Sequence, residues 1–231
     1  MTRRALIVVA KQPANGQTKT RLCPPLNGQE AAVLYECFLR DTLDLIRAAR
    51  QGLDLEAIIT YLPENAETYF HNLAPDFSLL PQRGRDLSER LDHATTHYLT
   101  VGQYDQVVIM DSDSPTLPAE CLRQAFATLT NGADLSLGPC DDGGYYLIGL
   151  KRPTADLFLE VEMSTAHVLA DTLAIADRLQ LQVKTLPVCF DVDTIEDLQR
   201  LAAELENLPN SVAVYTRGFL NAHPALLKEA R

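Results

Sequence analysis

Short apolar runs alternate with longer segments of helical periodicity along nearly the whole chain, and this alternation limits the possible folds more than any other feature. Strands that alternate with helices are typical of β/α units around a mainly parallel sheet. We therefore predict an α/β fold. Its strands are expected at residues 5–10, 55–62, 77–82, 106–110, 133–139, 145–150 and 181–188.

Residues that commonly begin helices lie between these strands, and two pairs of them have capping-box spacing. Helices are expected after Asn27 with Glu30, Asp86 with Glu89, Pro118, Ser164 or Thr165, and Thr194. In such sheets ligands bind at the carboxyl ends of the strands. The loops that lead from strand to helix are therefore expected to carry the function.

The size of the chain favours one domain. It has 231 residues, of which 46% are hydrophobic, enough for one large domain with a well-buried core. We place this domain at residues 1–206. After residue 206 the pattern changes, and residues 207–231 are expected either to pack back on the domain or to meet a second subunit in a homodimer.

The net charge of the chain limits the kinds of partner that it is expected to bind. Its formal net charge of −11 disfavours a nucleic acid or an anionic membrane surface, but a small phosphorylated substrate that brings its own cation is compatible.

The first apolar run is too short for a signal peptide or a membrane span, so we expect a cytoplasmic protein. The five cysteines form no C-x-x-C pair, which favours reduced thiols.

A basic loop, KQPANGQTKTRL at residues 11–22, directly follows the first strand. Lys11, Lys19 and Arg21 surround Gly16 in a stretch without a negative residue, which suits a phosphate chain. The glycine spacing is not that of a P-loop. The alternative is a solvated basic loop.

Carboxylates follow the fourth and the last predicted strands. Asp111 and Asp113 in DSDSP are typical ligands of Mg²⁺ or Mn²⁺. A polar turn is the alternative, because Asp and Ser side chains readily bond to nearby backbone N–H groups. Asp193 in DVDTIEDL is a candidate further ligand, whereas Asp197 has the spacing of a helix cap.

A glycine-rich segment, GPCDDGGYYLIGL at residues 138–150, has two interpretations. Asp-Gly is a favoured hairpin turn. Glycines beside aspartates also suit a backbone that must approach a ligand closely. Gly143 and Gly144 could serve both purposes.

Six segments, in this order, resemble the nucleotide-diphospho-sugar transferase superfamily. Their layout is similar to that of a bacterial branch of glycosyltransferases with inferred functions, and to phospholactate and phosphoenolpyruvate guanylyltransferases. The segments are KQPANGQTKTRL, GRDLSERL, DSDSP, GPCDDGGYYLIGL, MSTAHVL and DVDTIEDL. The resemblance implies a three-layer α/β/α sandwich with a mixed, mainly parallel sheet, Rossmann-like in its layout and of the kind called GT-A.

The resemblance also implies roles for individual residues. Phosphates would contact Lys11, Lys19 and Arg21 near Gly16, and the metal, Mg²⁺ or Mn²⁺, would be held by Asp111, Asp113 and Asp193. Asp86, Leu87 and Ser88 would flank the base or ribose. The acceptor side would be lined by Asp142, Gly143, Gly144, Ser164 and Thr165. Two departures, Met163 where an aromatic residue is usual and Ser88 where glycine is common, leave acceptor specificity open.

The expected function is metal-dependent transfer from an activated nucleotide, with Lys19, Arg21 and Asp113 as catalytic residues. Three cations in one loop slightly favour a nucleoside triphosphate donor, hence nucleotidyl transfer to a small phosphorylated or carboxylated acceptor with release of pyrophosphate. A glycosyltransferase that uses a nucleotide-sugar donor is the alternative. A non-catalytic nucleotide sensor is the second alternative.

Overall fold

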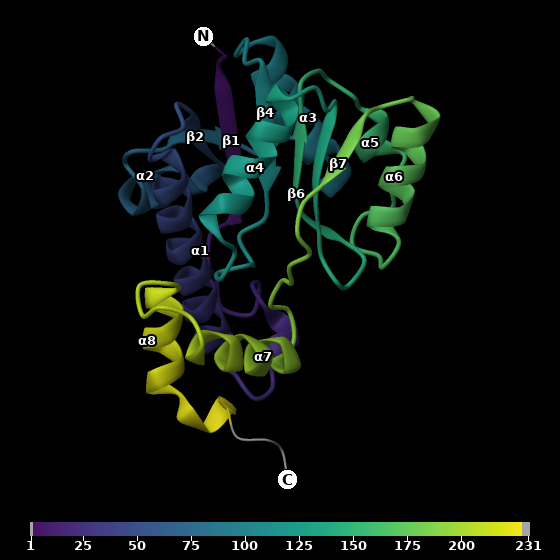
Figure 1. Cartoon of the computed structure of the whole chain (residues 1–231). Coiled ribbons are helices and arrows are strands. Elements are labelled where there is room, and N and C mark those ends of the chain that lie inside the picture. Colours follow the sequence, from purple (N-terminus) through teal and green to yellow (C-terminus); the bar gives the residue numbers. More distant parts are fainter. Residues whose placement is uncertain (1, 228–231) are drawn as a thin grey trace.

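The computed structural model describes residues 2–227 and contains one seven-stranded sheet (Figure 1). The strand order is β3-β2-β1-β4-β6-β5-β7. All seven predicted strands are present: β1 (Arg4–Lys11), β2 (Glu56–Leu62), β3 (Ser78–Pro81), β4 (Gln106–Met110), β5 (Leu135–Pro139), β6 (Tyr145–Leu150) and β7 (Val183–Thr185).

Helices cover both faces of the sheet, which confirms the predicted three-layer α/β/α sandwich. One face carries α1 (Gly28–Arg50), α2 (Glu67–Leu73) and α4 (Ala119–Thr130). The other face carries α3 (Leu87–Thr100), α5 (Asp156–Leu159) and α6 (Val168–Arg178). None of the described helices is long and apolar enough to cross a membrane.

The sheet is mixed because a single strand reverses its direction. Strand β6 runs antiparallel to both β4 and β5, whereas all the other neighbouring strands pair in parallel. The segment between β5 and β6 is therefore a hairpin connection, as one interpretation of the glycine-rich segment predicted. The carboxyl ends of β1 and β4 lie side by side, with Val8 opposite Met110.

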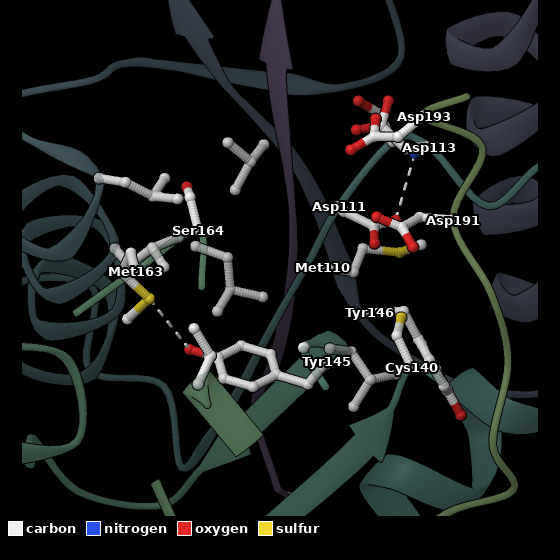
Figure 2. A pocket seen from close by; sticks show the side chains of 18 of the residues that line it. Met110, Asp111, Asp113, Cys140, Tyr145, Tyr146, Met163, Ser164, Asp191 and Asp193 are labelled. Atoms are coloured by element: carbon white, nitrogen blue, oxygen red, sulfur yellow. Dashed lines mark hydrogen bonds between the residues drawn. The ribbon is translucent and has the colours of Figure 1, made fainter. Parts of the chain in front are cut away.

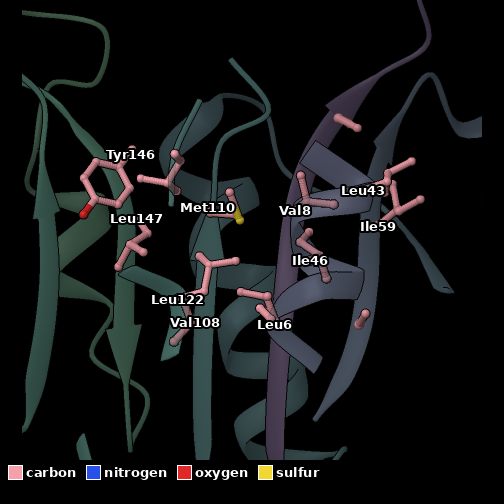
Figure 3. Close-up of a cluster of buried hydrophobic side chains, with 14 of the residues drawn as sticks. Leu6, Val8, Leu43, Ile46, Ile59, Val108, Met110, Leu122, Tyr146 and Leu147 are labelled. Carbon is pink, nitrogen blue, oxygen red and sulfur yellow. The ribbon is translucent and has the colours of Figure 1, made fainter. Parts of the chain in front are cut away.

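Alternating side chains of β1 and β4 supply the two halves of the core. Leu6, Val8, Val108 and Met110 pack against α1 and α4 (Figure 3). Ile7 and the other alternate residues of these strands point to the opposite face of the sheet, towards α3 and α6. Strands buried on both faces read as continuous apolar runs, which explains why β1 and β4 were recognisable from sequence.

The last part of the described chain packs on the end of α1. Helices α7 (Ile195–Glu206) and α8 (Val214–Ala222) form a third apolar cluster with α1 that contains Phe38, Leu201 and Phe219. The buried Asp41 of α1 accepts hydrogen bonds from the backbone N–H groups of Tyr215 (3.0 Å) and Thr216 (2.8 Å). A carboxylate at the N-terminus of a helix accepts hydrogen bonds from the free N–H groups there and interacts favourably with the helix dipole. Asp41, which belongs to α1, therefore caps α8.

Four of the five predicted helix starts, after Asn27, Asp86, Pro118 and Thr194, match the structure, and one does not. Reciprocal capping boxes are present at Asn27 and at Thr194. At Asp86 only half of the box forms, because the Glu89 carboxylate turns to Arg85 instead of the Asp86 N–H. The predicted cap at Ser164 or Thr165 is wrong. Helix α6 begins at Val168, because residues 164–166 form a turn in which Ser164 has φ +65°.

The two edge strands are shorter than predicted. The segment 181–188 forms a strand only over Val183–Thr185, and 77–82 only over Ser78–Pro81. Pro81 is the last residue of β3 and Pro187 lies just beyond β7, as expected because proline lacks an N–H and is largely confined to sheet edges.

The Asp41 cap predicts a stability effect of a residue that lines neither of the cavities described below. We expect Asp41→Ala to lower the free energy of unfolding by about 2–3 kcal/mol, because it leaves N–H groups of α8 unsatisfied in a buried place. For a chain of this size this is a fall in Tm of roughly 4–12 °C. Asp44→Ala on the same helix removes only an exposed ion pair with Arg47 and should change Tm little. Equal shifts in the two variants would contradict the capping role.

Candidate active site

A cavity of about 720 Å³ opens beside the carboxyl ends of β1 and β4. Its lining includes ten of the predicted site residues: Lys11, Arg21, Leu87, Asp111, Asp113, Asp142, Gly144, Ser164, Thr165 and Asp193. A smaller cavity of about 300 Å³, lined by residues of the basic loop, Lys19 among them, together with Asp113 and Asp193, adjoins it through shared residues. Strand-end loops distant in sequence are therefore brought to one place, as the topology of a parallel sheet requires.

The Lys19 ammonium joins three of these loops. Its Nζ lies 3.0 Å from Asp113 Oδ1 and 2.7 Å from Asp193 Oδ1, and its side chain is only 6% exposed. Burial by itself would lower the pKa of Lys19, but the carboxylates of Asp113 and Asp193 outweigh burial and raise this pKa above its usual value. Lys19 is therefore a permanent cation, held between the end of β4 and the start of α7.

The other two predicted phosphate contacts are more accessible. The Arg21 side chain is 72% exposed, and its guanidinium lies 3.5 Å from Asp193 Oδ2. Lys11 is exposed and donates from Nζ to the Gln17 carbonyl at 3.1 Å. These two side chains can contact a ligand at little cost in free energy, whereas Lys19 would first have to break its ion pairs with Asp113 and Asp193.

Four carboxylates crowd the same end of the cavity (Figure 2). Asp113 lies beside Asp193, and Asp111 lies beside Asp191. Burial, and next the Asp113 charge, raise the pKa of Asp111 well above its usual value. Burial, followed by the charges of Asp142 and Asp193, raises the pKa of Asp191 to about 6. Burial also opposes ionisation of Asp193, but Lys19 overcomes it and lowers the Asp193 pKa.

This donor set fits a divalent cation. Asp113 Oδ1 is buried and has no hydrogen-bond partner among the described residues, although it lies close to Lys19 Nζ. Carboxylate oxygens with spare lone pairs are the ligands that Mg²⁺ and Mn²⁺ prefer. One buried ammonium does not balance the four carboxylates, so a further cation would relieve their mutual repulsion.

A second group of donors lies beside the predicted metal ligands. One ligand atom from each of Cys140, Asp142 and Asp191 lies within 4.8 Å of the others, and within residues 2–227 this is the single trio of such residues that meets that distance. Asp111, Asp113 and Asp193 are thus in one cavity but are not drawn together as tightly. Their role as metal ligands stays a prediction.

Hydrogen bonds of Tyr35 and Gln82 support the floor of the cavity, and sequence reasoning missed both residues. The Tyr35 hydroxyl accepts from the Lys11 N–H (3.1 Å) and shares a hydrogen bond with Ser112 Oγ (3.0 Å). Gln82 donates to the carbonyls of Ala10 and Thr60. Tyr35 is indistinguishable in sequence from the apolar stripe of α1, so no local signal could have revealed it.

The glycine-rich hairpin and the Ser-Thr turn meet on the other side of the cavity. The Gly143 carbonyl accepts from the Leu169 N–H at 2.9 Å, and Asp142 Oδ1 accepts from the Gly144 N–H at 2.8 Å. Gly143 has φ +94°, and a Cβ there would collide with the Ala166 carbonyl. The position therefore requires glycine for two independent reasons.

Some predicted site residues lie outside the cavity lining. Gly16, Asp86, Ser88 and Gly143 are not among the lining residues. Asp86 caps α3, Gly143 packs under the Ser-Thr turn, and Ser88 donates to the Val161 carbonyl at 3.3 Å. Gly16 has φ +69° in the turn that precedes Lys19. These four residues shape the loops around the cavity.

Solved structures share this architecture. A crystal structure of a proposed nucleotide-diphospho-sugar transferase from Desulfovibrio desulfuricans G20 is 34% identical, with a TM-score of 0.88 over 98% of this chain and 97% of that one. A cytidylyltransferase from Leptospira borgpetersenii is 13% identical (TM-score 0.56, 100% of this chain and 99% of that one). A CMP:2-keto-3-deoxy-manno-octonic acid synthetase in complex with CTP is 10% identical (TM-score 0.57, 90% and 100%).

The fold and its solved neighbours place the chain in the nucleotide-diphospho-sugar transferase-like class, which confirms the resemblance seen in the sequence. Residues 45–165, more than half of the chain, match the family described as "Uncharacterized protein conserved in bacteria (DUF2064)", and the protein belongs to that family. Among proteins with curated functions, none matches the sequence significantly.

The Lys19 ion pairs predict a stability effect that depends on metal. We expect Lys19→Met to lower the free energy of unfolding by about 3 kcal/mol without divalent metal, because Asp113 and Asp193 lose their buried counter-charge. Addition of Mg²⁺ should restore part of the loss, measured by urea denaturation. Lys11→Met removes an exposed cation and should change stability by less than about 1 kcal/mol. A Lys19→Met deficit that is independent of Mg²⁺ would argue against a cation at these carboxylates.

The contact between Gly143 and Ala166 predicts a difference between two matched glycines. Gly143 and Gly52 have φ values of +94° and +91°, but a Cβ at Gly52 would meet nothing within 4 Å. Both alanine variants suffer the same backbone strain, and only Gly143→Ala must displace the Ser-Thr turn. We expect Gly143→Ala to cost roughly 1–3 kcal/mol more than Gly52→Ala in urea denaturation. Similar losses of unfolding free energy in the two variants would mean that the Ser-Thr turn moves aside at little cost.

Proposed function

We propose that the protein is a metal-dependent transferase that acts on an activated nucleotide, preferably by nucleotidyl transfer from a nucleoside triphosphate. The observation that supports this most directly is the charge arrangement of the cavity. Lys11 and Arg21 offer mobile cations at the same end as Asp111, Asp113 and Asp193. Anionic phosphates bridged to carboxylates by a cation would satisfy both sets of charges.

In this reaction an acceptor oxygen forms a bond to the α-phosphorus while the bond to the pyrophosphate oxygen breaks, and pyrophosphate leaves with that electron pair. Lys11 and Arg21 bind the phosphates that depart. Lys19 orients Asp113 and Asp193, which with Asp111 would hold the metal. Mg²⁺ or Mn²⁺, when bound, neutralises charge that develops on the phosphates. No protein nucleophile takes part.

The remaining predicted residues serve the two substrates. Leu87 lines the cavity near the predicted base or ribose site, and Asp86 and Ser88 fix the start of α3 beside it. Asp142, Gly144, Ser164 and Thr165 line the acceptor side, and Gly143 supports the turn that presents the two hydroxyls.

Glycosyl transfer from a nucleotide sugar is the second candidate, and two observations favour it. The relative that is 34% identical is described as a proposed nucleotide-diphospho-sugar transferase. Moreover, the pairing of Lys19 with two carboxylates leaves Lys11 and Arg21 as the unburied cations of the basic loop, which weakens the argument from three cations.

A product assay separates the two reactions. The protein is incubated with Mg²⁺ and each nucleoside triphosphate, or with nucleotide sugars, together with a panel of phosphorylated and carboxylated acceptors. Nucleotidyl transfer releases pyrophosphate, and glycosyl transfer releases nucleoside diphosphate. Saturable nucleotide binding without either product would favour the non-catalytic sensor.

The assignment of the metal ligands predicts unequal effects of three aspartate substitutions. We expect Asp113→Asn to lower kcat by at least about 100-fold and to weaken Mn²⁺ binding measured by electron paramagnetic resonance. Asp141→Asn, which breaks only an ion pair with Arg200 outside the cavity, should change kcat less than about twofold. If Asp191→Asn abolishes Mn²⁺ binding while Asp113→Asn retains it, the trio of Cys140, Asp142 and Asp191 is the metal site.

A further inference from the structure

The cavity that contains the carboxylates also has an apolar wall, and the proposed reaction does not yet use it. The wall comes from α3, β4, β6, α6 and the turn before α6, and its members are Leu91, Ile109, Tyr145, Met163 and Val168. Figure 2 shows Met163 and Tyr145 on one side and the labelled aspartates on the other.

This wall is built on the core of the protein. Leu91, Ile109 and Val168 are at least nine-tenths buried in the apolar cluster beneath α3 and α6. Tyr145 and Met163 are only partly buried, and they pack on that cluster with their remaining surface at the cavity. An apolar surface anchored in this way keeps its shape without a ligand, so it favours an apolar ligand group.

The Tyr145 hydroxyl lacks a strong partner. Among the described residues its hydrogen-bond contact is the Met163 sulfur at 4.0 Å, and a thioether is a weak acceptor. Burial raises the pKa of Tyr145, so the hydroxyl keeps its proton. A phenol that lines a cavity with only this contact can give a hydrogen bond to a polar atom set within an otherwise apolar ligand.

The turn before α6 places polar groups next to this wall. Ser164 has φ +65°, an unfavourable conformation for a residue with a Cβ, and it lines the cavity beside Met163. Thr165 donates to the Glu162 carbonyl at 3.0 Å and accepts from the His167 N–H at 3.3 Å, which holds the turn in place. The acceptor side thus combines hydroxyl groups with apolar carbon.

We propose that the acceptor is amphipathic, with an anionic or hydroxyl head at the carboxylate end of the cavity and an apolar body against Leu91, Ile109, Tyr145, Met163 and Val168. The proposal rests on the proposed function for the position of the head. A compact, fully charged acid would leave this wall exposed to water, so the wall would add nothing to the free energy of its binding. The wall therefore selects acceptors by apolar area.

A homologous series of n-alkyl phosphates, from methyl to octyl, tests the wall directly. Binding is measured by isothermal titration calorimetry with Mg²⁺ and the full chain. Each methylene group that reaches the wall should tighten binding by about 3- to 4-fold, so hexyl phosphate should bind at least about tenfold more tightly than methyl phosphate. Equal affinity along the series would overturn the proposal.

Substitutions in the wall locate the effect. Met163→Gln conserves length but adds an amide, and it should remove most of the gain from methyl to hexyl phosphate. Val188→Gln changes an apolar residue that is 63% exposed outside the cavity, and it should leave the gain unchanged. An undiminished gain in Met163→Gln would show that the alkyl chain binds elsewhere, which contradicts the proposal.

Nucleotide binding distinguishes this proposal from the proposed function. If Met163→Gln weakens binding of nucleoside triphosphates as much as that of hexyl phosphate, the wall holds the base and the acceptor proposal fails. If no nucleotide binds the wild-type protein although affinity rises with chain length, the proposed function fails instead. Nucleotide binding that is unchanged in Met163→Gln, with the chain-length effect lost, supports both.

Discussion

The ion pairs of Lys19 with Asp113 and Asp193 connect the parts of the protein that form the cavity. They join the loop after β1, the end of β4 and the start of α7, segments separated by up to 174 residues along the chain. A buried ammonium between two carboxylates is costly to leave unpaired, so each partner restrains the other two. The backbone follows the same connection, because the Val192 N–H donates to the Asp113 carbonyl at 3.0 Å.

The proposed function requires an acidic protein to bind an anionic ligand, and this arrangement would allow it. Burial, together with the charges of neighbouring carboxylates, raises the pKa of Asp111 and of Asp191, while Lys19 offsets only part of the negative charge. Such a site carries excess negative charge, and a cation that arrives with a phosphate would neutralise part of this charge and stabilise the site. Arg21 and Lys11, at the rim, can then meet the phosphate oxygens without losing buried partners.

The two ends of the cavity have different physical origins. The polar end consists of loops that begin where strands end, so its residues are spread over the chain and meet only through the topology of the sheet. The apolar end is the edge of the core that α3 and α6 help to form, where Tyr145 and Met163 are only partly buried. One cavity therefore provides both charge and apolar surface, as an amphipathic acceptor would require.

The sequence by itself determined the strands, the order of the α/β units, two capping boxes and the loops that line the cavity. Strand periodicity, turn residues and cap spacing are local properties, and strand ends of a parallel sheet meet at one edge. Only the tertiary structure decided that Lys19 is buried between two carboxylates, that Tyr35 and Gln82 support the cavity floor, that Asp41 caps α8, and that Tyr145 and Met163 form part of an apolar wall. Each of these depends on which distant side chains become neighbours, and no local pattern contains that information.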